Sequence, residues 1–363
     1  MMSGSPASSA LTMRALVVGL ALAMMPLAVG TAAPDSLLYA RLESYLEALR
    51  AQAGIPGLSV AIVGDTDIVW ERGFGRQDLS LGIAAQPDTP FHIDGLGQAL
   101  TATLVLQCVE QGKLSLDEPV GNYDPASADP GATIRQVLSH TSPGAFGESF
   151  TYRPERLESL RDAVRDCTGD SYRETLANLF DRLAMKDSVP GPDSVTLAPP
   201  SEGIPDTTTA ARYSAVLARL TTSYLVSEPG TASPVQHSAA TVTTTSGVVS
   251  TVRDLAQFDV ALKQGLLLAP DTLALAWSRP AAAGLQGLPH GLGWFVQTYN
   301  GQPVVWQFGV SEASSSFVVT LPTRSLTMIV LANSDGLVKP FVLAPGDVLA
   351  SPFARVFLGL LGP

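Results

Sequence analysis

The spacing of apolar and polar residues predicts that strands near the two ends of the chain enclose a helical middle. Residues 35–51 carry leucines at helical spacing on one face, which predicts an amphipathic helix. Residues 55–75 hold two β-branched runs on either side of a polar GDTD turn, which predicts a β-hairpin. Four further strand-like runs follow near the other end, at residues 290–300, 302–309, 314–322 and 325–335.

The middle of the chain has helical periodicity. Helices are predicted at residues 97–114, 133–141, 157–167, 172–185 and 254–265. A loop rich in Pro, Thr and Ser covers about 188–208, with less regular sequence to about 240, and residues 346–362 predict a last helix broken at Pro352. We therefore expect an α/β (α+β) fold: a mixed, mainly antiparallel sheet flanked by terminal helices, with an inserted all-helical subdomain.

The first 33 residues predict a secretory signal peptide. Arg14 precedes an apolar run at 15–29, and small residues follow at 30–33. We therefore expect an exported protein, periplasmic or extracellular, with a membrane contact only if this segment stays uncleaved. The remaining residues, 34–363, are expected to form one domain, with an α/β part at about 34–90 and 245–363 and a helical part at about 91–244. A site is expected at the seam between the two parts.

Composition narrows the class of function. Hydrophobic residues make up 46% of the chain and the net charge is −11, which indicates a folded protein and excludes a nucleic-acid partner because no basic patch is available. The four histidines lack metal-ligand spacing, and the GFGRQD segment at 73–78 does not open a helix as a phosphate loop must. No cofactor or metal is therefore expected. Whether the two cysteines, Cys108 and Cys167, form a disulfide stays open.

The order of several segments resembles the serine β-lactamase and penicillin-binding-protein-like family. These segments are PGLSVAIV, VWERGFGRQD, TPFHI, ALTATLVLQCVEQGKLSLDEPV, TIRQVLSHTS, SGVVSTVRDLAQFDVAL, GLGWFV and LANSD, and they span about residues 36–335. The resemblance is greatest to class C-like β-lactamases, esterases and D-aminopeptidases. It implies a β-lactamase/transpeptidase-like fold, in agreement with the predicted elements.

The first catalytic motif that this resemblance implies is S-x-x-K, which supplies a serine nucleophile and a lysine that takes its proton. The matching residues here run from Gly95 to Gln98. Glycine has no side chain, and the glutamine amide does not accept a proton at neutral pH. The nucleophile and the base are therefore both missing from the positions where the resemblance places them.

The other two motifs are degenerate as well. The Y-x-N motif reads Tyr152-Arg153-Pro154, so the tyrosine is kept and proline replaces the asparagine. The H-x-G or K-T-G motif reads Gln307-Phe308-Gly309, so the imidazole or cation is lost and the glycine is kept. All three losses together predict a catalytically inactive, β-lactamase-related protein.

We expect such a pseudoenzyme to retain a cleft for a peptide, acyl or protein ligand, such as a small molecule or a cell-wall peptide. The expected ligand-binding residues are Tyr152, Gln307, Gly309 and Ser311. The resemblance places oxyanion donors at the backbone N–H groups of Gly95 and a residue near Val310. A purely structural role is a further alternative, for which the sequence offers no marker.

Other residues offer an alternative in which the chain is an active hydrolase with a relocated nucleophile. Ser311 lies in GVSEA, a near match to G-x-S-x-G, although a strand-to-strand connection is expected there and the motif needs a strand-to-helix elbow. Asp94 is a candidate base for water, or more simply an N-cap of the following helix. The adjacent Ser139 and His140 are expected to belong to a structural turn. Two further serines, Ser142 and Ser149, have no identifiable base.

Overall fold

The computed structural model describes residues 1, 4, 34–143, 148–199, 201–227, 231–238, 241–280 and 287–362. Its main feature is a seven-stranded sheet in which the paired strands run antiparallel. The strands lie in the order β3 (Ile83–Ala84), β2 (Ile68–Asp78), β1 (Gly57–Val63), β12 (Leu326–Ala332), β11 (Ser315–Leu321), β10 (Gln302–Val310) and β9 (Phe295–Tyr299). The N-terminal hairpin therefore pairs with strands from the other end of the chain, and the expected fold class is confirmed.

The central strands are apolar almost throughout because helices cover both faces of the sheet. All seven residues of β1 are buried. Alternate side chains of a strand point to opposite faces, so Val60 and Ile62 pack in one core while Ala61 and Val63 pack in the other. The sheet thus separates two hydrophobic cores, one beneath the terminal helices and one beneath the helical part.

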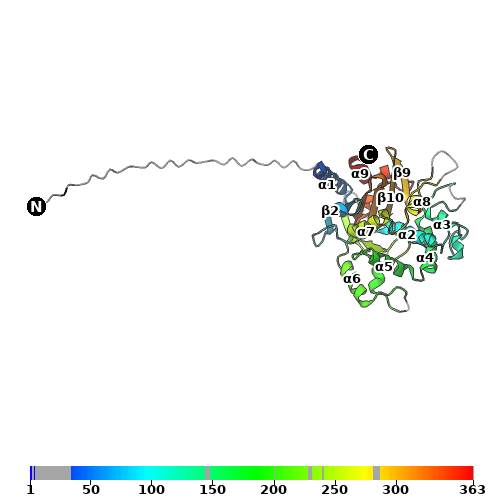
Figure 1. Ribbon diagram of the computed structural model, residues 1–363. Helices are drawn as coiled ribbons and strands as arrows, with labels where there is room; N and C mark the ends of the chain where they lie inside the picture. The colour runs from blue at the N-terminus through cyan, green and yellow to red at the C-terminus, as the bar shows by residue number, and fades with distance from the viewer. Residues whose placement is uncertain are drawn as a thin grey trace.

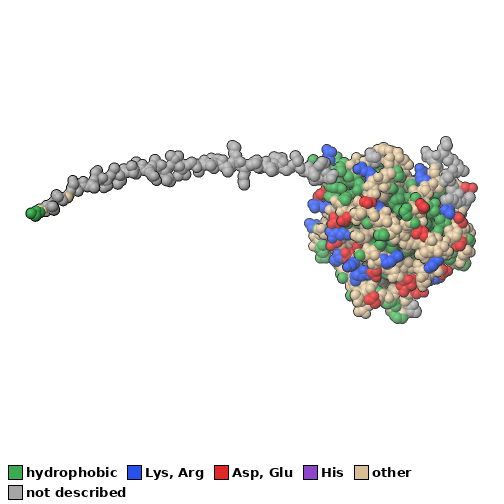
Figure 2. Space-filling model, in the orientation of Figure 1, with side chains coloured by type: hydrophobic (Ala, Val, Ile, Leu, Met, Phe, Trp, Pro, Cys, Tyr) green, Lys and Arg blue, Asp and Glu red, His purple; other side chains and the backbone are tan. Residues whose placement is uncertain are grey.

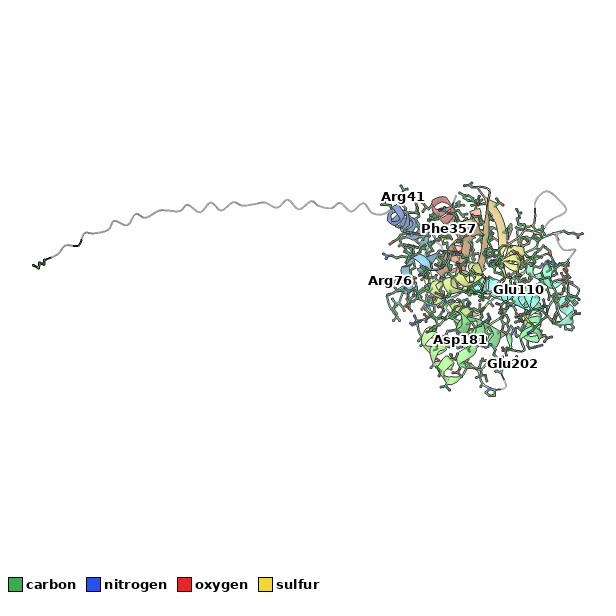
Figure 3. The ribbon with its side chains drawn as sticks, in the orientation of Figure 1. Arg41, Arg76, Glu110, Asp181, Glu202 and Phe357 are labelled. Atoms are coloured by element: carbon green, nitrogen blue, oxygen red, sulfur yellow. A yellow bond between two sulfur atoms is a disulfide. The ribbon has the colours of Figure 1, made fainter. Side chains whose placement is uncertain are left out.

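The two terminal helices, α1 (Pro34–Gln52) and α9 (Pro352–Leu361), lie together against one face of the sheet (Figure 1). Phe357 of α9, labelled in Figure 3, is fully buried there. The prediction that Pro352 breaks the last helix was wrong. Pro352 occupies the first turn of α9, where its missing N–H costs nothing, and the Ser351 side chain caps the helix.

Four helices of the inserted part match predicted helices. They are α2 (Gly97–Glu110), α3 (Ile134–Leu138), α4 (Arg161–Thr168) and α5 (Tyr172–Arg182). α2 is buried along nearly its whole length, which explains its apolar sequence. Capping boxes at Thr133 and Ser171 fix the starts of α3 and α5, and the left-handed Gly169 ends α4. α7 (Val252–Lys263) then returns the chain to the sheet.

Several short elements are absent from the sequence-based prediction. The expected loop after residue 188 leads into α6 (Thr207–Leu217), which begins at an Asp206 cap. The irregular stretch that follows contains a hairpin of β6 (Ser223–Ser227) and β7 (Thr231–Val235). α8 (Pro270–Ala276) was also missed, as was a small sheet of β4 (Phe91–His92), β8 (Val248–Ser250) and β5 (Val189–Pro190). These elements are short, and mixed polar sequence gives them no clear period.

The predicted signal segment at 1–33 lies outside the described residues, apart from positions 1 and 4. No helix in the described part of the chain is both long enough and apolar enough to cross a membrane. On the face shown in Figure 2, basic and acidic side chains are interspersed rather than gathered by sign.

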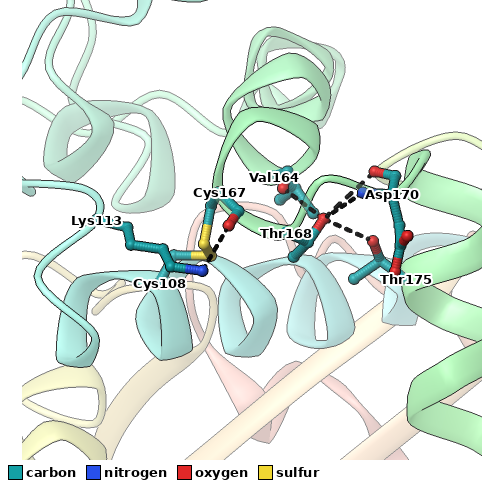
Figure 4. Close-up of a disulfide and its surroundings, with 7 residues drawn as sticks. All are labelled: Cys108, Lys113, Val164, Cys167, Thr168, Asp170 and Thr175. Atoms are coloured by element: carbon teal, nitrogen blue, oxygen red, sulfur yellow. Dashed lines mark hydrogen bonds between the residues drawn. A yellow bond between two sulfur atoms is a disulfide. The ribbon is translucent and has the colours of Figure 1, made fainter.

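Cys108 and Cys167, whose pairing the sequence left open, form a disulfide that joins α2 to α4 (Figure 4). Their Cα atoms are 6.1 Å apart, and the bond closes a sequence separation of 59 residues. The ammonium group of Lys113 donates to the carbonyl of Cys167 at 2.8 Å beside the bridge. The disulfide therefore fastens α4 to α2, the buried helix that begins at Gly97.

We predict that removing this disulfide lowers stability without changing the fold. A loop of this length is expected to contribute about 4 kcal/mol through the restricted unfolded chain. The double variant Cys108→Ala/Cys167→Ala should therefore unfold at a lower urea concentration than the oxidised protein, and dithiothreitol should lower the midpoint of the parent but not of the variant. An unchanged midpoint in both comparisons would contradict the prediction.

Candidate functional site

A pocket of about 220 Å³ lies where the 3-10 turn η1 (Asp94–Leu96) meets the end of β10 and the segment after β7. It is lined by Asp94, Gly95, Gln98, Tyr152, Pro154, His237, Ser238, Thr245, Ser246, Phe308, Val310 and Ser311. One pocket is therefore lined by five residues that the sequence analysis singled out: Gly95, Gln98, Tyr152 and Pro154 from the degenerate motifs, and Ser311 from GVSEA. No Lys or Arg is among these described lining residues.

The position expected for the nucleophile is closed by backbone. A Cβ atom placed on Gly95 would lie 2.7 Å from the carbonyl oxygen of Phe308 and 3.0 Å from the Cα of Gly309. A Cβ on Gly309 would in turn collide with the backbone N of Gly95, the carbonyl of Ile93 and the hydroxyl of Ser316. The missing side chains at residues 95 and 309 thus allow η1 and β10 to approach closely.

Gln98, at the position expected for the lysine base, is fully buried in a saturated hydrogen-bond network. Its Nε2 donates to the carbonyl of Gly95 at 3.1 Å and to the hydroxyl of Tyr152 at 2.6 Å. Its Oε1 lies 3.2 Å from Nε2 of His140. Because Nδ1 of His140 accepts from the backbone N–H of Arg153 at 3.1 Å, Nε2 carries the proton and donates to Gln98. This network contains no group that would readily take a proton from a nucleophile.

Tyr152, which is kept from the second motif, and Pro154, which replaces its asparagine, frame this side of the pocket. The ring of Tyr152 packs between Phe295 and Phe308, with ring centroids 5.4 and 5.2 Å away. Burial raises the pKa of the Tyr152 hydroxyl, which therefore stays protonated. Pro154 opens the 3-10 helix η3 (Pro154–Leu160) and lines the pocket with its ring. Tyr152 is thus a neutral hydrogen-bonding group at the pocket wall.

Gln307, expected from the sequence to bind a ligand, lies elsewhere. Its Nε2 donates to the carbonyl of Gly293 at 3.0 Å, and its Oε1 accepts from the N–H of Phe308 at 2.9 Å. The side chain is buried and is not part of the pocket lining. The structure therefore does not bring Gln307 to the other candidate residues.

The edge of β10 presents backbone groups to the pocket. The N–H of Ser311 donates to the carbonyl of Ser314 at 3.0 Å, so these two residues close a tight turn between β10 and β11, the strand-to-strand connection expected from the sequence. Hydrogen-bonded and non-bonded pairs alternate along an antiparallel ladder. Val310, which pairs with Ser315, therefore points its N–H away from β11. β9 pairs with β10 only as far as Trp306, which leaves that side of Val310 facing the pocket.

The opposite wall holds a polar cluster of Asp94, His237, Ser314 and Ser311. The Asp94 carboxylate lies 3.1 Å from Nε2 of His237 through Oδ1, and its Oδ2 accepts a short hydrogen bond from the hydroxyl of Ser314. The hydroxyl of Ser311 is 2.9 Å from that of Ser314 and 3.1 Å from Nε2 of His237. The Asp94 and His237 side chains are only 4% and 5% exposed.

This cluster differs from a Ser–His–Asp triad because the aspartate and the serine approach the same histidine nitrogen. In a triad the carboxylate holds one ring nitrogen, which leaves the other free to take the serine proton. Here a carboxylate oxygen faces Nε2 of His237, so an unprotonated Nε2 would place two acceptors against each other. The network therefore assigns a proton to Nε2, and that atom is a donor rather than a base for Ser311.

Asp94 does not act as the N-cap that the sequence suggested. Neither η1 nor α2 begins with a side-chain cap, and both Asp94 oxygens face the polar cluster instead. Its backbone has a φ of +44°, which is an uncommon conformation outside glycine, although aspartate tolerates it better than most residues. This conformation costs free energy locally, and the surrounding contacts hold Asp94 in it.

Sequence reasoning missed two members of this cluster. His237 lies in the irregular stretch after β7, and Ser314 lies in a run of three serines, so neither position carries a motif. The other serines behave differently: the hydroxyl of Ser139 donates to the carbonyl of Arg135, as expected for a structural turn, and that of Ser142 donates to Asp129. Among the described residues, no group of three His, Cys, Asp or Glu is arranged to hold a metal ion.

His92 packs against the back of the cluster. Its ring stacks on that of His237 with centroids 3.6 Å apart and nearly parallel planes. Burial first, and then the neighbouring His237, lower the pKa of His92 to about 4, against the opposing effect of Asp94. Burial similarly lowers the pKa of His290, beneath the Gln98 network, to about 4. Both imidazoles are therefore neutral at neutral pH.

Comparisons with known proteins agree with the fold. The sequence model of the family described as "Beta-lactamase" matches residues 42–350. A solved structure titled as an octameric penicillin-binding protein homologue from Pyrococcus abyssi superposes with a TM-score of 0.72 at 19% identity, covering 89% of this chain and 77% of that one. This likeness shows a shared fold.

Curated relatives match over shorter segments. An uncharacterised protein of Alkalihalophilus pseudofirmus is 30% identical over 36% of this chain and 44% of its own length. Penicillin-binding protein 4 of Amycolatopsis lactamdurans is 31% identical over 37% of this chain and 38% of its length. The human mitochondrial serine beta-lactamase-like protein LACTB is 31% identical over 27% of this chain and 19% of its length. The matched segments thus span less than half the length of these relatives.

We predict that His92 makes the protein less stable in mild acid. Its pKa is about 4 when folded, against an ordinary 6.5, so the stability it contributes is present above pH 6.5 and is lost as the pH falls through 4. Between pH 7.5 and 5 this loss is about 2 kcal/mol. The variant His92→Gln should show a correspondingly smaller decrease in unfolding free energy over that interval, measured with urea.

Comparing the parent protein with His92→Gln cancels the contributions that other titrating groups make to the pH dependence of stability. Burial raises the pKa of Asp254 to about 6, so this group favours the folded state as the pH falls, and it is present in both proteins together with His290. If both proteins lose the same free energy between pH 7.5 and 5, protonation of His92 is not coupled to unfolding as predicted.

Proposed function

This chain belongs to the beta-lactamase family, and on that premise we propose that it is an exported member that lacks the family's serine–lysine chemistry and binds a small, uncharged carbonyl compound in the pocket beside Gly95. The observation that carries the proposal is the replacement of the expected base by Gln98, whose amide is committed to Gly95, Tyr152 and His140. A side chain held in this way accepts no proton from a nucleophile, and Gly95 offers no nucleophile.

The charges around the pocket favour a neutral ligand over a carboxylate. The lining includes the buried carboxyl group of Asp94, and the described lining residues contribute no Lys or Arg to balance a second negative charge. The available groups are hydroxyls from Tyr152 and Ser311, together with the N–H that Val310 directs to this edge. Such groups hydrogen-bond an amide or ester carbonyl.

The size of the pocket limits the bound group. Its volume of about 220 Å³ lies below the range of about 300–1,000 Å³ that is usual for whole small-molecule sites. We therefore propose that it accepts one acyl or peptide unit of a ligand whose remainder stays outside, such as a short peptide or an acylated compound. The internal amide units of a cell-wall peptide belong to this chemical class.

Two features support export, one in the sequence and one in the structure. The basic residue, apolar run and small residues of the first 33 positions are arranged as in a secretory signal. The disulfide between Cys108 and Cys167 is a bond that persists in oxidising compartments outside the cytoplasm. A periplasmic or extracellular location would account for both.

We predict that restoring the missing side chains does not restore family chemistry. In Gly95→Ser/Gln98→Lys, the new Cβ at residue 95 meets the Phe308 carbonyl at 2.7 Å, so the backbone must shift before the hydroxyl reaches the pocket. Incubation with a penicillin, followed by intact-mass measurement, should give no stoichiometric adduct on either the parent or this variant. Rapid acylation of the variant at residue 95 would show that the pocket is still shaped for the family reaction.

We predict that a neutral dipeptide binds and that its acid form binds less well. An N-acetylated dipeptide amide at about ten times its dissociation constant should stabilise the protein by about 1.4 kcal/mol and raise the melting temperature by about 2 °C. The same dipeptide with a free carboxylate should raise it less. Val310→Trp, which blocks the pocket from a partly exposed position, should abolish the shift.

Val342→Trp is the matched control, because Val342 is 74% exposed and does not line the pocket. It should leave the shift intact. Equal stabilisation of the Val310→Trp and Val342→Trp variants would place the binding outside this pocket and contradict the proposal.

A further inference from the structure

We propose that Ser311 is a nucleophile toward neutral activated esters and phosphonyl groups, and that its hydroxyl proton passes through Ser314 to the carboxylate of Asp94. This reaction is separate from the serine–lysine route and uses residues outside the three degenerate motifs. It rests on the proposed function in one respect, because the electrophile must first occupy the pocket that Ser311 lines.

The direction of the hydrogen bonds in the cluster follows from its one acceptor-only group. The Asp94 carboxylate has no proton to donate, so the hydroxyl of Ser314 donates to its Oδ2. The oxygen of Ser314 then accepts from the hydroxyl of Ser311, 2.9 Å away. Two hydroxyls thus connect the pocket to a buried carboxylate, and each proton has a partner oxygen to move to.

His237 completes the arrangement as a donor. With its proton on Nε2, it lies within 3.1 Å of both Asp94 and Ser311. It thereby supplies a hydrogen-bond donor to a carboxylate whose side chain is only 4% exposed. His237 is a positioning residue in this scheme, and the base is Asp94 acting through Ser314.

The electrophile has a place beside the proton relay formed by Ser311, Ser314 and Asp94. Ser311 is half-buried and borders the pocket, as does Asp94, which is 3% exposed, whereas Ser314 is 1% exposed and is not part of the pocket lining. The neighbouring Val310 directs its backbone N–H to the same edge, where it would donate to a developing oxyanion. The relay therefore lies on one side of the reacting carbon and a fixed donor on the other.

The chemical step balances within this set of groups. The Ser311 oxygen bonds to the carbonyl carbon of an ester, its proton moves to Ser314, and the Ser314 proton moves to Asp94, while the carbonyl π pair becomes an oxyanion. Collapse of this intermediate breaks the bond to the leaving alcohol, which takes its proton from the hydroxyl of Ser314 while Asp94 returns a proton to Ser314. The products are an acyl-Ser311 ester and an alcohol, and water reverses the sequence to release a carboxylic acid.

The experiment measures covalent labelling of the full mature chain by an alkyl fluorophosphonate, with p-nitrophenyl acetate as a second, spectrophotometric probe. We expect one phosphonyl group per chain, which peptide mapping places on Ser311, with fluoride released. Ser311→Ala should remove the adduct. Ser278→Ala, which changes an exposed serine at the end of α8, should leave the labelling rate unchanged.

Variants of Asp94 and His237 test whether Asp94 acts as the base or only supports the local structure. Asp94→Asn keeps the shape but not the charge and should slow labelling by about 10²-fold or more. Asp94→Gly suits the φ of +44° at this position and leaves space for an added carboxylate, so formate should restore part of its rate. A purely structural loss would not respond to formate. His237→Gln keeps an N–H donor and should retain labelling to within about tenfold, whereas a histidine base would lose it.

The outcomes distinguish this inference from the function proposed above. No adduct on the parent, with the dipeptide amide still raising the melting temperature, overturns the relay and leaves the binding proposal standing. Absence of both contradicts the binding proposal as well. An adduct on another residue, or full-rate labelling of Asp94→Asn, overturns the relay. If the Asp94 variants do not fold, Ser311→Ala decides whether Ser311 is the nucleophile and His237→Gln whether histidine is its base.

Discussion

The close contact between η1 and the edge of β10 is the constraint on which the site depends. Gly95 and Gly309 face each other there, and a Cβ atom on either would strike the backbone of the other segment. The hydroxyl of Ser316 donates to the carbonyl of Ile93 and fixes the turn against the sheet. Because β9 stops pairing at Trp306, the free edge of β10 meets η1 directly rather than another strand.

This contact separates two polar networks that have opposite chemical character. On one side, Gln98 joins Tyr152 and His140 in a chain of neutral groups whose donors and acceptors are matched. On the other, Asp94 brings a negative charge that only donors can satisfy. The position that corresponds to the family's base thus holds a neutral amide, and the nearest carboxylate is that of Asp94, next to Gly95.

Long-range order and local chemistry were predictable from the sequence to different degrees. Central strands such as β1 and β12 are long and apolar, and α2 is a long buried helix, so their patterns were clear. The short helix α6 and the β6–β7 hairpin lie in polar sequence, where tertiary contacts rather than periodicity decide the structure. Pro352 was misread because a proline that ends one segment also suits the first turn of the next.

The same distinction applies within the site. The replacements at Gly95 and Gln98 were visible because the surrounding segments gave a register in which a gap could be noticed. His237 and Ser314 could not be found in this way, since they approach Asp94 from positions 143 and 220 residues away in the chain. Gln307 matched the register, but its side chain turns to the backbone of Gly293.

The position of one proton determines how the cluster around Asp94 is understood. Distances alone would suggest a triad, because Ser311 and Asp94 both lie within hydrogen-bond reach of His237. The carboxylate, however, faces the nitrogen that a triad needs to be vacant, and it also accepts from Ser314. A buried charge must be surrounded by donors, and that requirement turns His237 into a donor. The hydroxyl of Ser311 is then left with a path to Asp94 that runs through Ser314 and not through the imidazole.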